Sequence, residues 1–249
     1  MQFHLLASGS KGNCCVIIHN DSKIVIDCGT TKRYLSASFQ SIGFDYQQTD
    51  ALFITHTHSD HIKQLKMFDH IPTYSSVMLE TQHLSIVSPY EELQIKDLNI
   101  KVIPLSHDSE NTIGFVITSE KEKLVYITDT GYIKEEVKPY LKDADYYIFE
   151  SNHDIEMLMQ TNRPYFTKQR IISDSGHLCN EDSAKILCEL IHKQKTKEIV
   201  LAHISQEGNT REKAIHCLMK TMQEKQIDQK DIKIYPAAQF EIYSGGSYD

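Results

Sequence analysis

Apolar and polar residues along the chain fall into short runs with the period of β-strands and longer runs with the period of helices. In the first half, strand-like runs cover residues 2–6, 15–19, 23–27 and 51–54, and a helical pattern follows at about 59–69. Because strands come first and the helix follows, this half predicts a sheet with helical cover on one face.

The second half repeats this order with more helix, and it closes on two β-like pieces, EIVLAH and DIKIYPAAQFEIY. The earlier strand-like runs, and then the helical ones, cover residues 98–103, 113–118, 123–128 and 145–149, followed by 152–159, 164–172, 180–194 and 209–225. Two strand-rich halves with helical cover predict an α/β fold in which sheet packs on sheet between helical layers.

Length and composition fit this picture. A chain of 249 residues with 40% hydrophobic content buries a substantial core, and no repeat or Pro/Gly-rich linker marks a boundary. We therefore expect one domain over residues 1–249.

No apolar run is long enough for a membrane span, and the N-terminal segment lacks the features of a signal peptide. The six cysteines form no CxxC pair, so we expect reduced thiols in a cytoplasmic protein without a membrane partner.

The charge balance argues against one class of partner contact. With 34 acidic and 26 basic residues the formal net charge is -8, which disfavours general attraction to nucleic acid over the whole surface. A nucleic-acid substrate at a local site remains compatible with this charge, because bound divalent cations would reverse the field of a carboxylate-rich site.

The densest chemistry lies in ALFITHTHSDHIKQL, residues 51–65. Residues two apart in an extended segment point to the same side, so His56 and His58 can bind one ion from a strand end. Ser59 is expected to cap the following helix, which places Asp60 and His61 in its first turn and indicates a second ion. A polar loop with solvated histidines is the alternative; the apolar strand before and the helix after disfavour it.

Other apolar runs also end in a single metal-ligating residue. Asp27 ends KIVID, His107 follows IKVIPLS, Asp129 ends KLVYITD and His203 ends EIVLAH. Each alone is explained by an ordinary strand-end polar residue. Together with FITH they predict a metal site at one edge of a sheet scaffold.

This set of residues resembles the ligand set of the metallo-β-lactamase fold superfamily, an αββα sandwich. The resemblance runs from about residue 1 to 245. It implies one metal held by His56, His58 and His107, a second held by Asp60, His61 and His203, and Asp129 as the bridge, with Asp27 orienting ligand histidines. Because no cysteine replaces a ligand, we expect two divalent ions of zinc, manganese or iron.

Two further residues resemble the phosphodiesterase branch of that superfamily, which includes tRNase Z. Glu150 ends the run YYIFE, and His177 lies in SDSGHLCNEDSA just before a helix whose expected N-cap is Asn180. The resemblance implies that His177 protonates the leaving oxygen and that Glu150 orients it, since an alkoxide is a poor leaving group. The alternative is a helix-start histidine bonded to backbone.

The spacing between the motifs excludes two kinds of enzyme within the phosphodiesterase branch. The interval from His107 to Asp129 is too short for the tRNA-binding arm of bacterial tRNase Z, and the interval from Asp129 to His203 is too short for a β-CASP domain. We therefore expect a compact single-domain phosphodiesterase.

The strings LASGSKGNC, FESNHDIEML, SDSGHLCNEDSA and TDTGYI resemble the YycJ/WalJ family. That family implies a metal-dependent 5′→3′ DNA exonuclease with a proposed role in DNA repair. Cys179 stands where serine is usual, and SQEGN follows His203 where a double asparagine is common, which puts the role of Asn209 in doubt. DNA is favoured over RNA as the substrate.

Contacts to substrate are less defined by sequence. Glycine-rich turns can offer backbone N–H groups to phosphate, yet any tight turn uses the same residues. Helix capping is the favoured explanation for one candidate, Asn152. The candidates for substrate contact are Ser8, Ser10, Asn13, Asn152, His153 and Asn209, with Lys11, Lys63, Arg163, Lys168 and Arg170 as candidates for phosphates or for simple surface charge.

The resulting hypothesis is phosphodiester hydrolysis, in which a metal-held hydroxide oriented by Asp60 attacks phosphorus and His177 acts as general acid. Three alternatives share parts of the pattern: a small-molecule cyclic phosphodiesterase, an acyl hydrolase of the glyoxalase II or lactonase kind, and a non-catalytic regulatory protein. The complete ligand set gives the last one little support.

Overall fold

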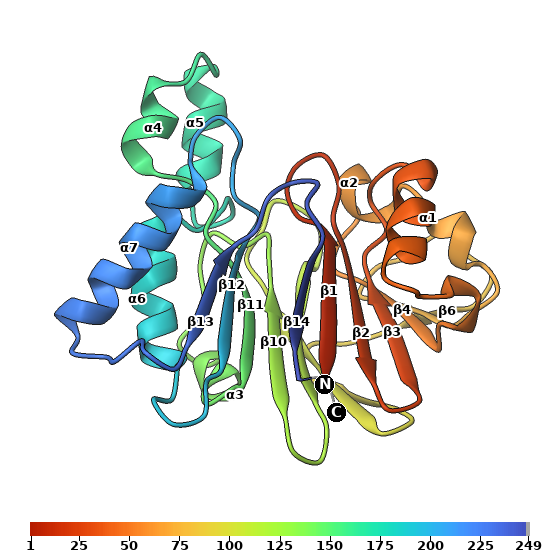
Figure 1. Ribbon diagram of the computed structural model, residues 1–249. Helices are drawn as coiled ribbons and strands as arrows, with labels where there is room; N and C mark the ends of the chain where they lie inside the picture. The colour runs from red at the N-terminus through yellow and green to blue at the C-terminus, as the bar shows by residue number, and fades with distance from the viewer. Residues whose placement is uncertain (248–249) are drawn as a thin grey trace.

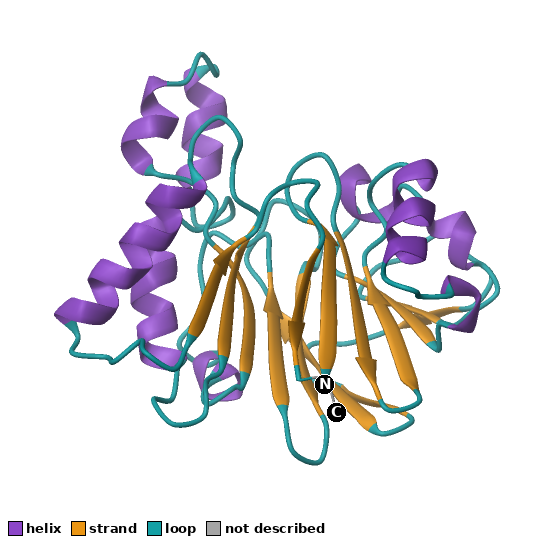
Figure 2. Ribbon diagram, viewed as in Figure 1, coloured by secondary structure: helices purple, strands orange, loops and turns teal. Residues whose placement is uncertain are grey.

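Two seven-stranded sheets face each other, and helices cover their outer faces (Figure 1, Figure 2). The protein is described by a computed structural model over residues 1–247. In spatial order the first sheet contains β14 (Tyr243–Gly246), β1 (Gln2–Ala7), β2 (Cys14–His19), β3 (Ser22–Ile26), β4 (Ala51–Ile54), β5 (Thr73–Ser75) and β6 (Leu84–Ile86). The second sheet contains β13 (Lys233–Pro236), β12 (Glu198–Ala202), β11 (Tyr146–Glu150), β10 (Lys123–Ile127), β9 (Ile113–Thr118), β8 (Leu98–Pro104) and β7 (Glu92–Ile95).

The helices form the two outer layers. Leu35 and Phe39 of α1 pack on the outer face of the first sheet, while Leu187 of α6 and Leu218 of α7 pack on the outer face of the second. The α-helices are α1 (Lys32–Ser41), α2 (Ser59–Ile62), α3 (Lys138–Leu141), α4 (Ile155–Gln160), α5 (Tyr165–Ile172), α6 (Asn180–Leu190) and α7 (Arg211–Glu224), and the 3₁₀ turns are η1 (Tyr46–Gln48) and η2 (Leu65–Phe68). The expected αββα sandwich is confirmed.

Burial on both faces explains why the central strands read as continuous apolar runs. In β2, Cys15 and Ile17 point between the sheets, whereas Cys14 and Val16 point toward the helices of the first sheet. A strand covered on one side only would alternate apolar with polar residues. The continuous apolar runs made these strands recognisable in the sequence. They did not indicate which side chains of a strand face the other sheet and which face the helices.

Mixed pairing directions bring one set of strand ends together. β3, β4, β5 and β6 are parallel neighbours, and so are β10, β11, β12 and β13. The carboxyl ends of parallel strands lie at one edge of a sheet, and ligands commonly bind there. Both sheets therefore present a row of strand ends at the same rim (Figure 1).

Several local expectations were wrong. The helical pattern at 59–69 is two pieces, α2 and η2, because the Gln64 N–H donates to the Cys28 carbonyl instead of continuing the helix. The N-cap of α2 is His58 rather than Ser59, and that of α6 is Cys179 rather than Asn180. α6 ends at Leu190, short of the expected 194.

The chain's last β-like piece is divided between the sheets. β13 pairs with β12 in the second sheet, and β14 pairs with β1 in the first.

The periodicity of the sequence had not indicated the strands β5, β6 and β7 or the helices α1 and α3. Among residues 1–247, every helix is too short or too polar to cross a bilayer.

An aromatic cluster between the sheets dominates the core. The ring of Phe53 on β4 is stacked on Tyr74, with 4.9 Å between centroids, and lies edge-on to Phe115 on β9 at 5.3 Å. Phe53 is fully buried. It therefore joins the strand that leads to His56 with a strand of the opposite sheet.

We expect Phe53→Ala to lower the free energy of unfolding by about 3–5 kcal/mol, because it leaves a cavity between the sheets. Urea denaturation followed by circular dichroism measures the change. Ile86→Ala on the edge strand β6, where the side chain is half exposed, is the matched control and should cost less than about 0.5 kcal/mol. Equal losses in the two variants would contradict a core that depends on this ring.

Candidate metal centre and active site

The side chains expected at the site come from strand ends on one rim. Asp27 follows β3, Asp129 lies two residues beyond β10, and His203 follows β12. All three have a left-handed backbone, with φ of 60°, 59° and 55°. This conformation costs about 1–2 kcal/mol for residues other than glycine, and it turns the chain sharply out of the strand. Such strained positions cluster at functional sites.

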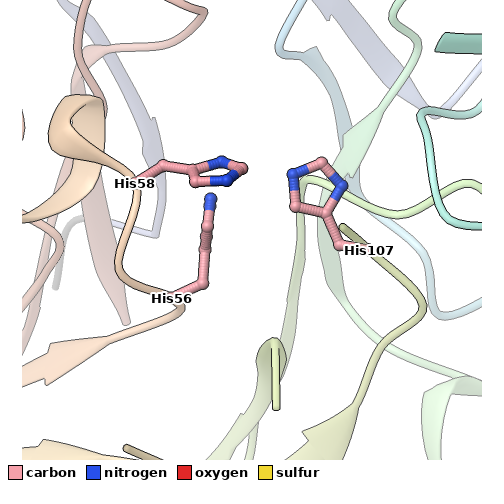
Figure 3. A group of neighbouring side chains, drawn as sticks. All are labelled: His56, His58 and His107. Atoms are coloured by element: carbon pink, nitrogen blue, oxygen red, sulfur yellow. The ribbon is translucent and has the colours of Figure 1, made fainter. Parts of the chain in front are cut away.

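The possible ligand atoms of nine side chains converge there. The nitrogens of His56, His58 and His107 lie within 4.8 Å of one another, and Figure 3 shows the first two on one side facing His107 across the space between them. The described structure brings together three further groups within the same limit: Asp60, His61 and His203; His56, His61 and Asp129; and Asp129, Glu150, His177 and His203.

Asp129 lies between the two triads. One carboxylate oxygen is 3.3 Å from Nε2 of His203 and 4.0 Å from Nε2 of His107, and the other is 3.4 Å from Nε2 of His61. Burial would raise the pKa of Asp129, but the surrounding imidazoles hold it well below its usual range. The residue is therefore a carboxylate placed to touch both groups of histidines.

Within residues 1–247, three buried atoms of this centre have no hydrogen-bond partner: Nε2 of His56, Oδ2 of Asp129 and Nε2 of His203. Buried polar atoms are nearly always paired, and a carboxylate with imidazole nitrogens is a donor set for divalent cations such as zinc, manganese or iron. The residues present therefore fit divalent metal binding.

A buried carboxylate orients His61. Oδ2 of Asp27 is 2.8 Å from Nδ1 of His61, and Asp27 also accepts hydrogen bonds from the backbone and side chain of Thr55. Burial would lower the pKa of His61, but Asp27 and Asp129 outweigh it and raise that pKa to about 9. Metal-ligating histidines commonly have such a partner on the second nitrogen. Thr55 was not among the residues predicted from the sequence. Its position between the apolar strand and His56 could have indicated its role at the site.

His107 is oriented from the other half of the molecule. Its Nδ1 is 2.9 Å from the carbonyl oxygen of Gly176, so Nε2 points to the centre. Asp108, which sequence reasoning also missed, has Oδ1 at 3.3 Å from Nε2 of His107 and Oδ2 at 3.2 Å from Arg170. Arg170 in the last turn of α5 and Gly176 in the loop that follows α5 thus both contact the centre.

Glu150 and His177 form a close pair beside the centre. Oε1 of the fully buried Glu150 is 2.7 Å from Nδ1 of His177 and 3.2 Å from Nδ1 of His203, while Oε2 accepts the Thr130 N–H at 2.8 Å. Burial would raise the pKa of Glu150, but His177 and His203 lower it to about 2. Because the side chain of His177 contacts Glu150, the alternative of a helix-start histidine bonded to backbone is disfavoured.

Most residues expected to contact substrate instead support the ligand loops. Oγ of Ser8 accepts the His203 N–H at 2.8 Å, and the buried amide of Asn13 is 2.8 Å from Nε2 of His61. The Asn152 amide donates to the His203 carbonyl at 2.9 Å, and Asn209 donates to the carbonyl of Asn152 at 3.1 Å. We interpret these four as positioning residues.

Two other candidates differ from them. Ser10 is exposed at the tip of the turn after β1. His153 is buried, and its Nδ1 has no hydrogen-bond partner in the part of the chain that the structure describes. Capping was the wrong explanation for Asn152, because Asp154 caps α4 with its side chain on the Met157 N–H.

Glycine and cysteine serve the local geometry at two points. A Cβ on Gly29 would lie 1.5 Å from the carbonyl oxygen of Asp60, so only glycine allows α2 to approach the strand end after Asp27. Cys179 caps α6 by accepting the Asp182 N–H at 3.4 Å, which is the role a serine would have there.

Known proteins match this arrangement along nearly the whole chain. The family model described as the β-lactamase superfamily domain matches residues 22–204. The exodeoxyribonuclease YycJ of Bacillus anthracis is 32% identical over 240 residues, which cover 90% of this chain and 90% of that protein. The chain belongs to the YycJ/WalJ family of the metallo-β-lactamase superfamily. The resemblance inferred from the motifs is confirmed.

Other YycJ/WalJ relatives and solved structures agree. The exodeoxyribonuclease WalJ of Streptococcus pneumoniae is 28% identical and covers 97% of this chain and 93% of that protein. The metallo-β-lactamase fold protein YhfI from Bacillus subtilis has a TM-score of 0.67 at 16% identity, over 97% of this chain and 98% of that chain. At that identity the second comparison shows the fold alone.

The charge state of this YycJ/WalJ centre predicts proton release on metal binding. Burial would lower the pKa of His203 too, but Asp129 and Glu150 raise it to about 9, as the carboxylates do for His61. Both imidazoles are therefore protonated at pH 7 before a metal binds, and a metal requires the neutral ring.

We expect Zn²⁺ binding at pH 7 to release about two protons, with affinity that rises as pH increases toward 9 and then levels off. Calorimetry in buffers of different ionisation enthalpy measures the number of protons. Asp27→Asn should lower the number, because it removes the carboxylate that favours protonated His61. Binding without proton release would contradict the charge state described for these histidines.

Proposed function

We propose that this chain is a 5′→3′ DNA exonuclease that works with two divalent metal ions. The observation that carries the proposal is the Glu150–His177 pair, at 2.7 Å, beside a centre of seven metal-ligating side chains. Hydrolysis of a phosphodiester expels an alkoxide, which is a poor leaving group, so a positioned acid that protonates it accelerates the reaction. The names of the relatives in Bacillus anthracis and Streptococcus pneumoniae, both exodeoxyribonucleases, support DNA as the substrate.

The donor groups divide between two ions. His56, His58 and His107 would hold one, Asp60, His61 and His203 the other, and Asp129 would contact both. When bound, zinc, manganese or iron would supply Lewis-acid stabilisation of the phosphate and a lower pKa for a nucleophilic water. Asp60, which is partly exposed at the centre, would accept a hydrogen bond from that water and orient it.

The acid function follows from the tautomer that Glu150 selects. A carboxylate with a pKa of about 2 stays ionised near neutrality, so it accepts a hydrogen bond from Nδ1–H of His177 and leaves Nε2 as the nitrogen that carries the proton to be transferred. Nε2–H then faces outward from the pair and donates its proton to the departing 3′ oxygen. After transfer the ring remains in the Nδ1–H tautomer that Glu150 already binds.

The short segments between the site residues and the free cysteines support a compact cytoplasmic enzyme. Elements of the two sheets and their helices fill the segments between His107, Asp129 and His203, which supports one domain without an inserted arm. Within the described residues all six cysteines are free thiols, as a reducing compartment favours.

Metal-free protein reloaded with Mn²⁺ or Zn²⁺ should release mononucleotides from the 5′ end of linear DNA before any label at the 3′ end is lost. Single-stranded and duplex DNA, labelled separately at each end, measure both activity and direction. Asp129→Ala is the control and should be inactive, because the contact shared by both triads is removed. Activity on cyclic phosphates with none on DNA would move the assignment to a small-molecule phosphodiesterase.

We expect His177→Ala to lower kcat by about 10²–10⁴ while metal content stays that of the unaltered protein, since a positioned acid contributes a factor of that size. Steady-state kinetics and metal analysis of the same sample provide the two readouts. His216→Ala, at an exposed histidine on α7, is the matched control. Loss of metal from His177→Ala would show that His177 is a ligand and would overturn the assigned role.

A further inference from the structure

Exposed apolar side chains gather on one helical hairpin. Of the large hydrophobic residues among 1–247 that are strongly exposed, Tyr165 at 65% and Phe166 at 73% belong to α5, with Ile172 at its end, and Ile155 and Met159 belong to α4. We call residues 155–172 the α4–α5 hairpin. It projects beyond the rim of the sheets, on the side where the strand ends meet (Figure 1).

Hydrogen bonds hold the two helices of the α4–α5 hairpin in a fixed arrangement. Nζ of Lys168, which is buried, donates to the carbonyl oxygens of Met159 and Thr161, both at 2.7 Å, and so ties α5 to the end of α4. The Asp154 N–H donates to the Gly208 carbonyl at 2.9 Å at its base. This explains why Lys168, a candidate phosphate contact, is not available to a ligand. Exposed rings on a braced element are presented in a fixed orientation.

The carboxyl end of α5 reaches the metal centre. Arg170 is 3.2 Å from Asp108, the same carboxylate that lies 3.3 Å from Nε2 of His107. Residues four apart share a helix face, so Phe166 lies on the same side as Arg170, about 6 Å farther along the axis. A chain that leaves the centre along α5 therefore meets a guanidinium first and an aromatic ring next.

Cation and ring together indicate the kind of ligand. Single-stranded nucleic acid is bound by basic side chains along the phosphates and by aromatic rings on which unpaired bases stack. Arg170 supplies the positive group of this surface: it is 61% exposed, and its contact with Asp108 at 3.2 Å leaves guanidinium N–H groups open to solvent. Arg163, at the turn between α4 and α5, is instead paired with Glu207 at 2.9 Å. Paired bases cannot offer their faces to a ring, so the surface distinguishes unpaired from paired strands.

We propose that the α4–α5 hairpin binds unpaired bases of the substrate strand by stacking on Tyr165 and Phe166, while Arg170 contacts a backbone phosphate next to the metal centre. This inference rests on the proposed nuclease function. It makes single strands and duplexes with unpaired ends better substrates than blunt duplexes.

The kinetic test compares the double variant Tyr165→Ala/Phe166→Ala with the unaltered enzyme on an oligothymidylate of about 12 nucleotides. We expect KM to rise about tenfold to a hundredfold, because each stacked base contributes that order of affinity. Turnover of bis(p-nitrophenyl) phosphate, which has no flanking nucleotides to stack on Tyr165 or Phe166, reports on the centre itself. Tyr140→Ala is the control: its exposed ring belongs to α3, which lies at the opposite end of the sheets from α4 and α5 (Figure 1).

A binding test uses a property of the composition. The chain has no tryptophan, so Phe166→Trp creates one fluorophore on the hairpin, and this conservative ring should keep the KM of the unaltered enzyme. With metal chelated, so that no strand is cut, oligothymidylate should quench its fluorescence. Tyr140→Trp should show no quenching.

The outcomes separate this inference from the nuclease assignment. DNA hydrolysis with unchanged KM in the double variant and no quenching of Phe166→Trp would overturn the inference and leave the nuclease intact. Quenching without any DNA hydrolysis would support the hairpin as a nucleic-acid surface and remove the nuclease assignment. Concentration-dependent self-association that disappears in the double variant would assign the rings to a second copy of this chain and overturn the inference.

Discussion

A buried carboxylate among imidazoles is the interaction on which the rest of the structure depends. Asp129 has oxygens within 4.0 Å of nitrogens on His61, His107, His177 and His203. An ionised group removed from water is tolerated only with compensating charge and hydrogen bonds. No single element can surround one carboxylate with so many imidazoles, so the residues must come from both sheets and from the loop before α6.

This requirement links the core to the chemistry. The first sheet supplies His56, His58, Asp60 and His61, and the second supplies His107, Asp129, Glu150 and His203. The distance between the two sets is therefore determined by the side chains packed between the sheets, with Phe53 and Phe115 in contact across that layer. Left-handed turns at Asp27, Asp129 and His203 then direct each side chain to the common space.

Local sequence patterns indicated most residues of the candidate site. Parts of the fold depend on pairing between strands that are distant in the sequence, and local patterns do not show this pairing. The HxHxDH segment and the strand-end residues could be predicted because each depends on a few neighbours along the chain. The strands β5 and β6 have three residues each, too few for a period to show. β13 and β14 are close in sequence but join different sheets, which only their partners β12 and β1 decide. Asn13 was expected to contact substrate and Thr55 was not noticed, because the roles of both depend on contacts with His61.

The segment from Arg170, in the last turn of α5, to His177 makes several contacts with the centre. Arg170 contacts Asp108 beside the centre, the Gly176 carbonyl orients His107, and His177 pairs with Glu150, which also touches His203. A strand bound along α5 would hold the start of this segment, while a metal bound to His107 would hold its middle. Ordering at either end reduces the freedom of His177, because a short loop fixed at both sides has few conformations left. In the function that we propose, substrate and metal binding would therefore act together on the position of His177, so that its proton would be presented when both are in place.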